Sequence, residues 1–410
     1  MTMPVKPKRR ILIFSLVYYP RFVGGAEVAI KEITDRISPD DVEFDMVALR
    51  LDGALSRFEK VGNVGVYRVG FAMEHKESAD SLRFPLFLNK YLFPFMGFWK
   101  AEQLEKSRHY DAMWCMMASY NGFAALFFKL THPAIPYLLS LQEGDPISYI
   151  KKRVSVLYPL FRKIFTKADM VQTISNYLAD FARQMGYEGR IEVVPNGVDV
   201  ARFSKKYESK EIRDLKERLG KKAGDKFVVT TSRLVVKNAV SDIIKALKYL
   251  PDNVKFLVLG SGYEMRALKK LADNKGLSER VRFLGYVAHE DMPQYLKISD
   301  VFVRPSLSEG FGNSFIEAMA AGLPVVATPV GGIVDFLRDG ETGLFCEVGD
   351  PRSIADKIKI FLSDDNLREK IIAHAAKMVQ EKYEWDKISR DMLKIFVAVS
   401  DSDVDKKSIL

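Results

Sequence analysis

The sequence predicts an α/β protein of two doubly wound domains, and three observations lead to that prediction. In the second half of the chain, short β-type segments alternate with segments of helical period, which is the pattern of a parallel sheet covered by helices. The first half shows the same alternation less regularly. The chain has 410 residues, 48% of them hydrophobic, and is long enough for two domains with separate cores. We therefore expect two Rossmann-like domains that face each other across a cleft.

The elements follow in order along the chain. In the first half, strands are predicted at 11–19, 43–49, 64–69, 112–119, 136–142, 170–175 and 190–196. In the second half, strands are predicted at 227–234, 254–260, 281–285, 300–306, 324–330 and 343–348. Pro195, Asn196 and Gly197 interrupt the chain between the two sets, and the charged helix 208–220 follows. We place the amino-terminal domain at 1–200 and the carboxyl-terminal domain at 201–384.

Composition leaves several partners open. The formal charge of +9 suits nucleic acid, an anionic membrane face or phosphorylated small molecules. The only two cysteines, Cys115 and Cys346, lie far apart and outside any metal-like spacing, which indicates a reducing compartment. A basic run precedes the apolar segment 11–19, as in a signal peptide, but no small-residue cleavage pattern follows. We read this segment as a buried first strand and expect a cytoplasmic protein.

The stretch SEGFGNSFIEAMAAG, residues 308–322, carries two carboxylates, Glu309 and Glu317, with seven residues between them. It lies at a turn from a strand to a helix, and parallel sheets bind ligands there because helix amino-termini offer unpaired N–H groups. From the first helical turn, the two oxygens of Glu317 could accept both hydroxyls of a ribose, and Glu309 would reach the other end of the ligand. The alternative for Glu317 is a capping box with Ser314, which leaves Glu309 unexplained.

Two other turns from a strand to a helix carry candidate groups. Gly24 and Gly25 follow the first strand, where backbone amides can approach a diphosphate; the alternative is a turn that needs positive φ. Arg233 and Lys237 follow the first strand of the second half and could hold a diphosphate, unless both are solvated surface residues. The five histidines are scattered and the D-x-D at 401–403 lies in the polar tail, so we expect no metal site.

With these motifs identified, the chain resembles the retaining nucleotide-sugar glycosyltransferases of family 4, which have the glycosyltransferase-B (GT-B) fold. The resemblance covers nearly the whole chain and is densest from 194 to 350. It rests on PNGVDVARF, on SRLVVKNAVSDIIKAL, on the Glu-x7-Glu pair within PSLSEGFGNSFIEAMA, and on GGAE near the amino-terminus. The resemblance implies transfer of a sugar from a UDP-, GDP- or ADP-sugar without a metal or another cofactor, and no nucleic-acid partner.

The resemblance also implies roles for single residues. Glu309 would contact the donor sugar and Glu317 the ribose, while Arg233 and Lys237 would hold the diphosphate. The amino-terminal domain would bind the acceptor, and a final helix at 385–399 would pack back on it. The remaining donor-binding positions are Gly24, Gly25, Gly285, Tyr286, Gly310, Phe311, Gly312 and Asn313.

This sequence departs from the family pattern in the strand that ends at YLLSLQEGDP. Many members carry a histidine near that strand end, where it positions the donor sugar or the acceptor. Here Gln142 stands in its place, with Glu143 and Asp145 just after. Either these side chains take over the role or the site handles a different sugar. Asn238 also replaces the usual glycine after the lysine, without removing the cation.

Residues 148–167 bear on the acceptor. Apolar residues recur at helical spacing among six basic residues, and no acidic residue lies among them. Such a stretch can lie on an anionic membrane surface, or it can pack on its own domain with a solvated face. The neighbouring aromatic run RFPLFLNKYLFPFMGFW favours a lipid-linked acceptor. We therefore consider peripheral association with the inner face of a membrane.

Three functions remain open from the sequence. The first is a retaining glycosyltransferase of cell-envelope polysaccharide or glycolipid assembly, acting on a glycan or lipid-linked acceptor. The second keeps the fold but is a nucleotide-sugar epimerase or a phosphorylase. The third is a non-catalytic nucleotide-sugar-binding protein, which the missing histidine makes conceivable.

Overall fold

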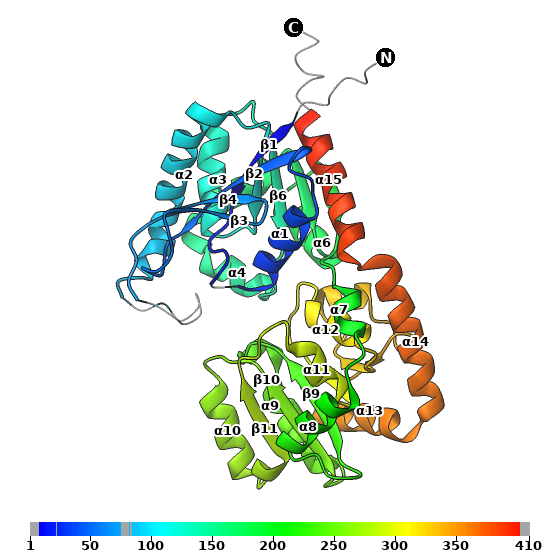
Figure 1. Ribbon diagram of the computed structural model, residues 1–410. Helices are drawn as coiled ribbons and strands as arrows, with labels where there is room; N and C mark the ends of the chain where they lie inside the picture. The colour runs from blue at the N-terminus through cyan, green and yellow to red at the C-terminus, as the bar shows by residue number, and fades with distance from the viewer. Residues whose placement is uncertain (1–7, 22, 75–81, 83, 402–410) are drawn as a thin grey trace, which may run out of the picture. The chain divides into compact units, whose positions relative to one another are not determined.

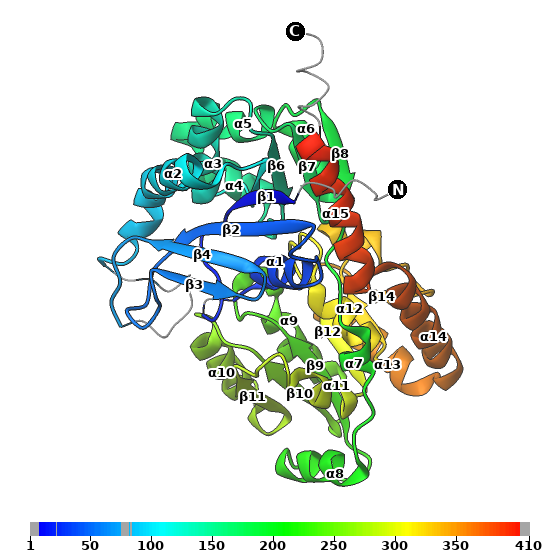
Figure 2. The ribbon, with the colours of Figure 1, turned by 45° about the horizontal axis from the view of Figure 1, so that its top comes forward.

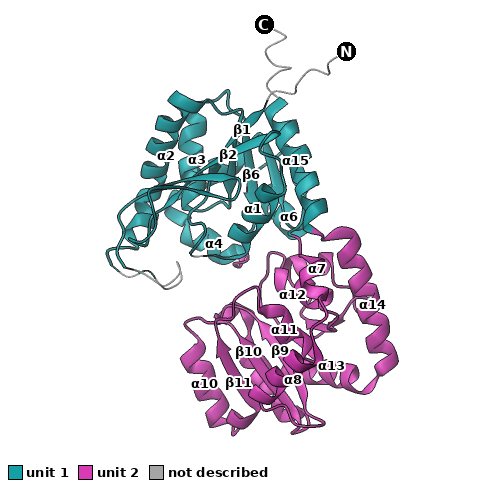
Figure 3. Ribbon diagram, in the orientation of Figure 1, with its two compact units in different colours: residues 1–143, 147–196, 385–410 teal, residues 144–146, 197–384 magenta. Residues whose placement is uncertain are grey.

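The computed structural model describes residues 8–21, 23–74, 82 and 84–401 (Figure 1). The chain divides into two compact units, shown in Figure 3. Unit 1 contains residues 1–143, 147–196 and 385–410, and unit 2 contains residues 144–146 and 197–384. Each unit is built around one sheet with helices packed against it, so the predicted α/β class of two doubly wound domains is confirmed.

Unit 1 is built on an eight-stranded sheet in the order β3-β4-β2-β1-β5-β6-β7-β8. Every neighbouring pair in it is parallel except β3 with β4. The strands are β1 (Arg9–Phe14), β2 (Val42–Leu49), β3 (Phe58–Val61), β4 (Val64–Val69), β5 (Ala112–Met116), β6 (Tyr137–Leu141), β7 (Met170–Thr173) and β8 (Arg190–Val193).

Alternating side chains of β1 separate the two faces of this sheet. Ile11 and Ile13 pack into a core with helices α1 and α15, whereas Phe14 lies against Phe128 of α3 at 5.9 Å between ring centroids. Figures 1 and 2 show α2 and α3 together on the second face. The helices of unit 1 are α1 (Gly25–Asp35), α2 (Leu88–Arg108), α3 (Tyr120–Thr131), α4 (Ile147–Arg153), α5 (Tyr158–Thr166), α6 (Asn176–Gln184) and α15 (Trp385–Asp401), with a short 3₁₀ turn η2 (Ser155–Leu157).

The last helix, α15, belongs to unit 1 although more than 180 residues of unit 2 precede it. Its apolar stripe, which includes Trp385, Met392 and Phe396, is buried in the core of unit 1. The ring of Phe396 lies 5.0 Å from that of Trp114 on β5 and 5.6 Å from that of Phe44 on β2. Burial of this stripe holds the end of the chain on the first sheet.

Unit 2 is built on a six-stranded parallel sheet in the order β11-β10-β9-β12-β13-β14. Its strands are β9 (Lys226–Thr231), β10 (Val254–Leu259), β11 (Val281–Gly285), β12 (Val301–Arg304), β13 (Val325–Ala327) and β14 (Leu344–Phe345). This is the 3-2-1-4-5-6 order of nucleotide-binding α/β sheets, with the reversal between β9 and β12. Strands β9 and β12 pair directly, with Val301 opposite Val228 and Phe302 opposite Val229.

Helices cover the sheet of unit 2 and close its core. They are α7 (Val200–Ser204), α8 (Ser209–Arg218), α9 (Val240–Ala246), α10 (Met265–Asn274), α11 (Met292–Lys297), α12 (Asn313–Ala320), α13 (Pro351–Ser363) and α14 (Asp365–Lys382). Short 3₁₀ turns lie at η3 (Val236–Asn238), η4 (Leu247–Tyr249), η5 (Ser278–Arg280) and η6 (Gly331–Asp335). Side chains of α9, α10 and α13 pack with the strands in one buried apolar cluster.

One strand was missed by the sequence prediction, and the structure also shows what becomes of the basic stretch. Strand β3 was not expected, because its four residues pair only at the edge of the sheet and are not fully buried, so they carry little apolar pattern. The basic stretch at 148–167, for which membrane contact and packing on its own domain were both considered, lies in α4, η2 and α5, with Pro159 near the start of α5. Phe161 and Ile164 of the predicted apolar stripe are buried within unit 1, so this part of the stripe is core.

Among the described helices, none has the length and the apolar content needed to cross a bilayer. Of the D-x-D at 401–403, Asp401 ends α15 and pairs with Arg9 at 2.7 Å, whereas Asp403 lies outside the described residues.

We predict that Phe396→Ala lowers the free energy of unfolding of unit 1 by about 3 to 5 kcal/mol, because it opens a cavity between α15, β2 and β5. Urea denaturation followed by tryptophan fluorescence measures the loss. Lys394→Ala, on the exposed side of the same helix, should cost less than about 1 kcal/mol. Equal losses for the two variants would contradict the packing described for α15.

Candidate functional site

The candidate site of unit 2 lies where β9 and β12 end. Ligands of open parallel sheets bind outside the carboxyl ends of the strands at the point where the strand order reverses, and in this sheet that point is between these two strands. The turn after β9 carries Arg233 and Lys237, and the turn after β12 carries Glu309. The pairing of the two strands therefore brings residues some seventy positions apart in the chain to one edge of the sheet.

Glu309 is held in a tight, buried turn and is 8% exposed. One of its carboxylate oxygens accepts from the guanidinium of Arg304, and the other accepts from the N–H of Gly310 at 3.2 Å. Gly331, at φ +55°, packs so closely that a Cβ there would lie 1.9 Å from the carbonyl oxygen of Glu309. The backbone and the side chain of Glu309 are thus both fixed before any ligand binds.

Arg304, the last residue of β12, is the residue that sequence reasoning missed at this carboxylate. Besides Glu309, its guanidinium donates to Ser314 Oγ at 2.9 Å and to Asn238 Oδ1 at 3.0 Å. Asn238 in turn donates to the backbone oxygen of Arg233 at 2.6 Å. Arg304 therefore ties the turn after β9 to the turn after β12. The signal in the sequence was a cation ending the buried strand VFVR.

Lys237 lies beside Glu309 and is largely buried. Its Nζ pairs with Asp145 at 3.3 Å, and a Cβ at Gly144 would meet both Lys237 Nζ at 2.7 Å and Glu309 Oε1 at 3.3 Å. Burial lowers the pKa of Lys237, and the carboxylates of Glu309 and Asp145 oppose that shift only in part. Arg233 is exposed, and its charge also acts on Lys237. The site therefore combines a buried ammonium group with an exposed guanidinium.

Glu317 lies in the second turn of α12, which follows Gly312 at φ +94°. No capping box forms with Ser314, because the helix starts at Asn313 and Ser314 bonds Arg304 instead. Glu317 Oε1 lies 2.9 Å from Nε2 of His289, a second residue that the sequence analysis overlooked. The signal for it was a histidine placed four residues after the end of β11.

The contacts of His289 define its neutral tautomer. Arg202 Nη1 lies 3.2 Å from His289 Nδ1, and a guanidinium can only donate, so Nδ1 accepts and the Nε2–H donates to Glu317. Burial lowers the pKa of His289, but its hydrogen bond and charge interaction with Glu317 outweigh burial and hold the pKa above 6.5. The hydrogen bond from His289 to Oε1 thereby fixes the orientation of the Glu317 carboxylate.

The other predicted donor-binding residues of unit 2 have different surroundings. Phe311 is 1% exposed and its ring packs against Phe336 and Tyr383, so only its backbone can face a ligand. Gly285 ends β11 at φ +72°, and the side chain of Tyr286 just after it is 80% exposed. Gly310 and Gly312 are buried in the turn, and Asn313 begins α12.

Gly24 and Gly25 lie in unit 1, at the turn from β1 to α1. The N–H of Gly24 donates to the carboxylate of Glu27 at 2.7 Å. Gly24 has φ −123°, so a need for positive φ does not explain the glycine at this position. A Cβ on Gly24 would approach only Glu27 Oε2, at 3.0 Å, and this atom ends a flexible side chain that can move aside, so local packing does not require a glycine here either.

The three residues at the position of the missing histidine have different partners in the structure. Gln142 and Asn196 exchange two amide hydrogen bonds, at 3.2 and 3.1 Å, within unit 1. Glu143 is buried in the same unit and accepts from the N–H of Ala118 at 2.6 Å. Asp145 belongs to unit 2, where it pairs with Lys237.

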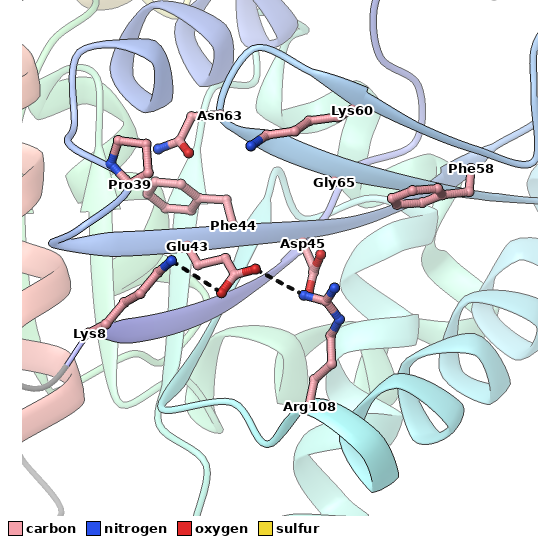
Figure 4. Close-up of a pocket in the computed structure, with 10 residues that line it drawn as sticks. All are labelled: Lys8, Pro39, Glu43, Phe44, Asp45, Phe58, Lys60, Asn63, Gly65 and Arg108. Atoms are coloured by element: carbon pink, nitrogen blue, oxygen red, sulfur yellow. Dashed lines mark hydrogen bonds and ion pairs between the residues drawn. The ribbon is translucent and has the colours of Figure 1, made fainter.

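A small cavity of about 120 Å³ lies elsewhere, at the amino ends of β2 and β4 in unit 1 (Figure 4). Four of its charged residues pair with one another: Arg108 bonds Glu43 at 3.1 Å and Asp45 at 2.9 Å, and Lys8 lies 3.6 Å from Glu43. Ligands of parallel sheets bind at the opposite ends of the strands, and we assign this cavity no part in the site.

Two family models together cover most of the chain, one matching its first half and the other its second half. The model described as Glycosyltransferase Family 4 matches residues 23–202, and the model described as Glycosyl transferases group 1 matches residues 211–378. The chain belongs to the group 1 and family 4 glycosyltransferases. It is accordingly an enzyme of the glycosyltransferase class, as the sequence analysis expected.

Individual proteins agree with this assignment. The glycosyltransferase is 27% identical to an uncharacterized glycosyltransferase of Methanocaldococcus jannaschii, over 94% of this chain and 97% of the relative. It is 29% identical to the GDP-mannose-dependent alpha-(1-6)-phosphatidylinositol monomannoside mannosyltransferase of Mycobacterium tuberculosis, over 62% of this chain and 67% of the relative. Among solved structures, Anabaena HepE in complex with UDP-glucose matches with a TM-score of 0.77 at 21% identity, covering 95% of this chain and 99% of that one, which shows the shared GT-B fold.

We predict that Arg304→Met and Glu309→Gln each destabilise unit 2 of this glycosyltransferase by about 3 kcal/mol, because each leaves a buried charge without its partner. The double variant should lose at least about 1 kcal/mol less than the sum of the two. Chemical denaturation of all four proteins measures this coupling. The exposed pair Lys359 and Asp356 serves as the control and should couple by less than about 0.5 kcal/mol. Additive losses at Arg304 and Glu309 would contradict the buried pair.

We predict a pH dependence for His289. Because folding raises the pKa of His289 above its ordinary 6.5, its stabilising effect is complete below pH 6.5 and is lost as the pH rises through the raised value. The difference in Tm between wild type and His289→Gln should therefore shrink from pH 6 to alkaline pH. His132→Gln serves as the control. It removes a histidine–glutamate contact of equal length in unit 1, so it tells an effect of His289 in unit 2 from the effect of losing any such contact. A difference that does not vary with pH would refute this.

Proposed function

We propose that this glycosyltransferase takes a sugar from a nucleotide-diphosphate donor and transfers it, with retention of anomeric configuration and without a metal ion, to a glycan or lipid-linked acceptor. One observation carries the proposal: Glu309, Lys237 and Glu317 are fixed around the strand ends at the switch point of the sheet of unit 2. Two carboxylates beside cations suit a ligand that has hydroxyls at both ends and a diphosphate between them.

In this proposal the donor lies across the site with its ribose at Glu317. The hydrogen bond from His289 leaves Glu317 Oε2 for the ribose hydroxyls. Gly285 and Tyr286 lie at the end of β11, which is separated from β9 by one strand, and would contact the base through backbone groups. The GDP-mannose dependence of the mycobacterial relative and the UDP-glucose bound to HepE support a nucleotide sugar as donor. Both bases therefore belong among the candidates.

Bond cleavage at the anomeric carbon places negative charge on the leaving diphosphate and positive charge on the sugar. Arg233, Lys237 and the N–H groups after Glu309 would stabilise the diphosphate, since groups aimed at developing charge give the largest catalytic effect. Lys237 is paired with Asp145 in the structure, and the diphosphate would replace Asp145 as its partner. The fixed carboxylate of Glu309 would face the sugar, where it can orient hydroxyls and stabilise positive charge.

Unit 1 would bind the acceptor. Gln142, oriented by its amide pair with Asn196, would take the place of the family histidine. Gly24 and Gly25 would offer amides to an anionic group once Glu27 releases the N–H of Gly24. The phosphatidylinositol in the name of the mycobacterial relative supports a lipid-linked acceptor. The cytoplasmic side of the membrane as the place of action is part of the proposal and rests on the sequence alone. The assembly of envelope polysaccharide or glycolipid is the pathway class that this chemistry serves.

A donor screen tests the proposal. Isothermal titration with UDP-, GDP- and ADP-sugars should identify one nucleotide, and the slow release of free sugar from that donor reports turnover. We expect Glu309→Gln to lose turnover while binding survives, and Glu317→Ala to weaken binding by about 1 to 3 kcal/mol because a hydrogen bond to the ribose is lost. Turnover should also persist in a chelator.

Each alternative has its own outcome in the same assays. Donor binding without transfer or hydrolysis would indicate a binding protein instead of an enzyme. An epimerised sugar nucleotide, or a sugar phosphate formed only when phosphate is added, would indicate an epimerase or a phosphorylase. Full inhibition by the chelator, reversed by magnesium, would overturn the metal-free mechanism, and equal effects of the two glutamate variants in both assays would overturn their separate roles.

A further inference from the structure

Helix α2 of unit 1 exposes large apolar side chains on the side away from its own core. Tyr91, Leu92, Phe95 and Trp99 are 58, 45, 57 and 64% exposed. Residues 91, 95 and 99 are spaced by four, so they share one face of the helix. Phe93, Gly97, Ala101 and Leu104 of the same helix are buried in unit 1. We call the exposed set, Tyr91, Leu92, Phe95 and Trp99, the aromatic face.

Ring contacts hold the aromatic face in place. Phe95 packs on Phe127 at 5.8 Å, and Trp99 packs on Phe98 at 5.4 Å between ring centroids. Tyr91 meets Tyr120 of α3 edge to face at 5.3 Å. The buried side of α2 already anchors the helix on unit 1. The exposed rings are therefore not needed to fill the core, and their contact with water is unfavourable. A gathering of exposed rings of this kind marks an interaction surface.

A basic segment adjoins the aromatic face. Arg153 of α4 donates to the hydroxyl of Tyr120 at 2.8 Å and stacks over the same ring, so Tyr120 joins α4 to Tyr91. Lys152 beside it is exposed. After α4, Val156 and Leu157 are 91 and 52% exposed. No aspartate or glutamate occurs in the sequence from 88 to 101 or from 147 to 168.

We propose that the aromatic face and α4 together dock this glycosyltransferase on an anionic lipid bilayer. Tyrosine and tryptophan favour the boundary between lipid headgroups and acyl chains, and lysine and arginine favour anionic headgroups. The charge of this surface favours an anionic bilayer over a second copy of the chain as its partner. A second copy would present the same two segments, which carry no aspartate or glutamate to pair with the basic residues, whereas an anionic surface complements those residues.

This inference rests on the lipid-linked acceptor of the proposed function and deepens it. It also moves the expected membrane contact from the stripe at 148–167, in which Phe161 and Ile164 are core, to α2 with the exposed end of α4 and η2. An enzyme docked by this face would take its acceptor from the lipid on which it sits and its donor from the aqueous side.

Vesicle co-sedimentation of the full-length protein tests the inference. We expect wild type to bind vesicles of phosphatidylcholine with phosphatidylglycerol and to bind pure phosphatidylcholine weakly. Phe95→Ser with Trp99→Ser should lower binding to the anionic vesicles at least about tenfold. Lys152→Glu with Arg153→Glu should remove the preference for anionic vesicles. Val334→Ser with Val348→Ser, which removes two half-exposed apolar side chains of unit 2, should leave binding unchanged.

Three results would overturn the inference: no binding of wild type to anionic vesicles, equal binding by the aromatic double variant, or equal loss of binding by the valine control. A dimer without lipid that the aromatic double variant converts to a monomer, with vesicle binding retained, would assign the face to a second copy. Donor binding and sugar release, measured on the same variants without vesicles, report the proposed function separately. Failure of the membrane inference can therefore be told from failure of the proposed function.

Discussion

The direct pairing of β9 with β12 is the constraint on which the candidate site depends. Because these two strands are neighbours at the reversal of the sheet, the turns that follow them meet without an intervening strand. Arg304 then joins the turns through Glu309, Ser314 and Asn238. A strand inserted between β9 and β12 would separate the carboxylate from the cations by about 5 Å for each strand added.

The charged and polar groups that we assign to ligands already have partners inside the protein. Asp145 pairs with Lys237, His289 with Glu317, and Glu27 with the N–H of Gly24. For Lys237 and Glu317, whose side chains are largely buried, the physical reason is the cost of leaving a buried charge unpaired. Ligand binding at such a site exchanges partners instead of filling vacancies. Asp145 and Glu27 are acidic, and in the proposed function an anionic group of a ligand would replace each of them.

Elements of this chain can be predicted from the sequence where a residue pattern repeats. The strand segments predicted in this way correspond to the strands of both sheets other than β3, because a buried parallel strand requires a run of apolar residues. Edge strand β3 pairs on one side and lacks such a run. The site roles given to Glu309 and Glu317 remain predictions, but the positions of both could be read from a motif. Arg304 and His289 could not, since each acts through a partner that is distant in the sequence or on another element.

By itself, the sequence determined the α/β class, the order of strands and helices, and the carboxylate motif of this glycosyltransferase, because local periodicity and turn chemistry encode them. The packing of the final helix on the first domain was implied by the family resemblance, whereas only the tertiary structure decided that Gln142 pairs with Asn196 and that one face of α2 stays exposed. Those outcomes depend on which surfaces meet after the chain has folded. An apolar stripe has the same spacing whether it is buried in a core or exposed to solvent, and only packing tells the two apart.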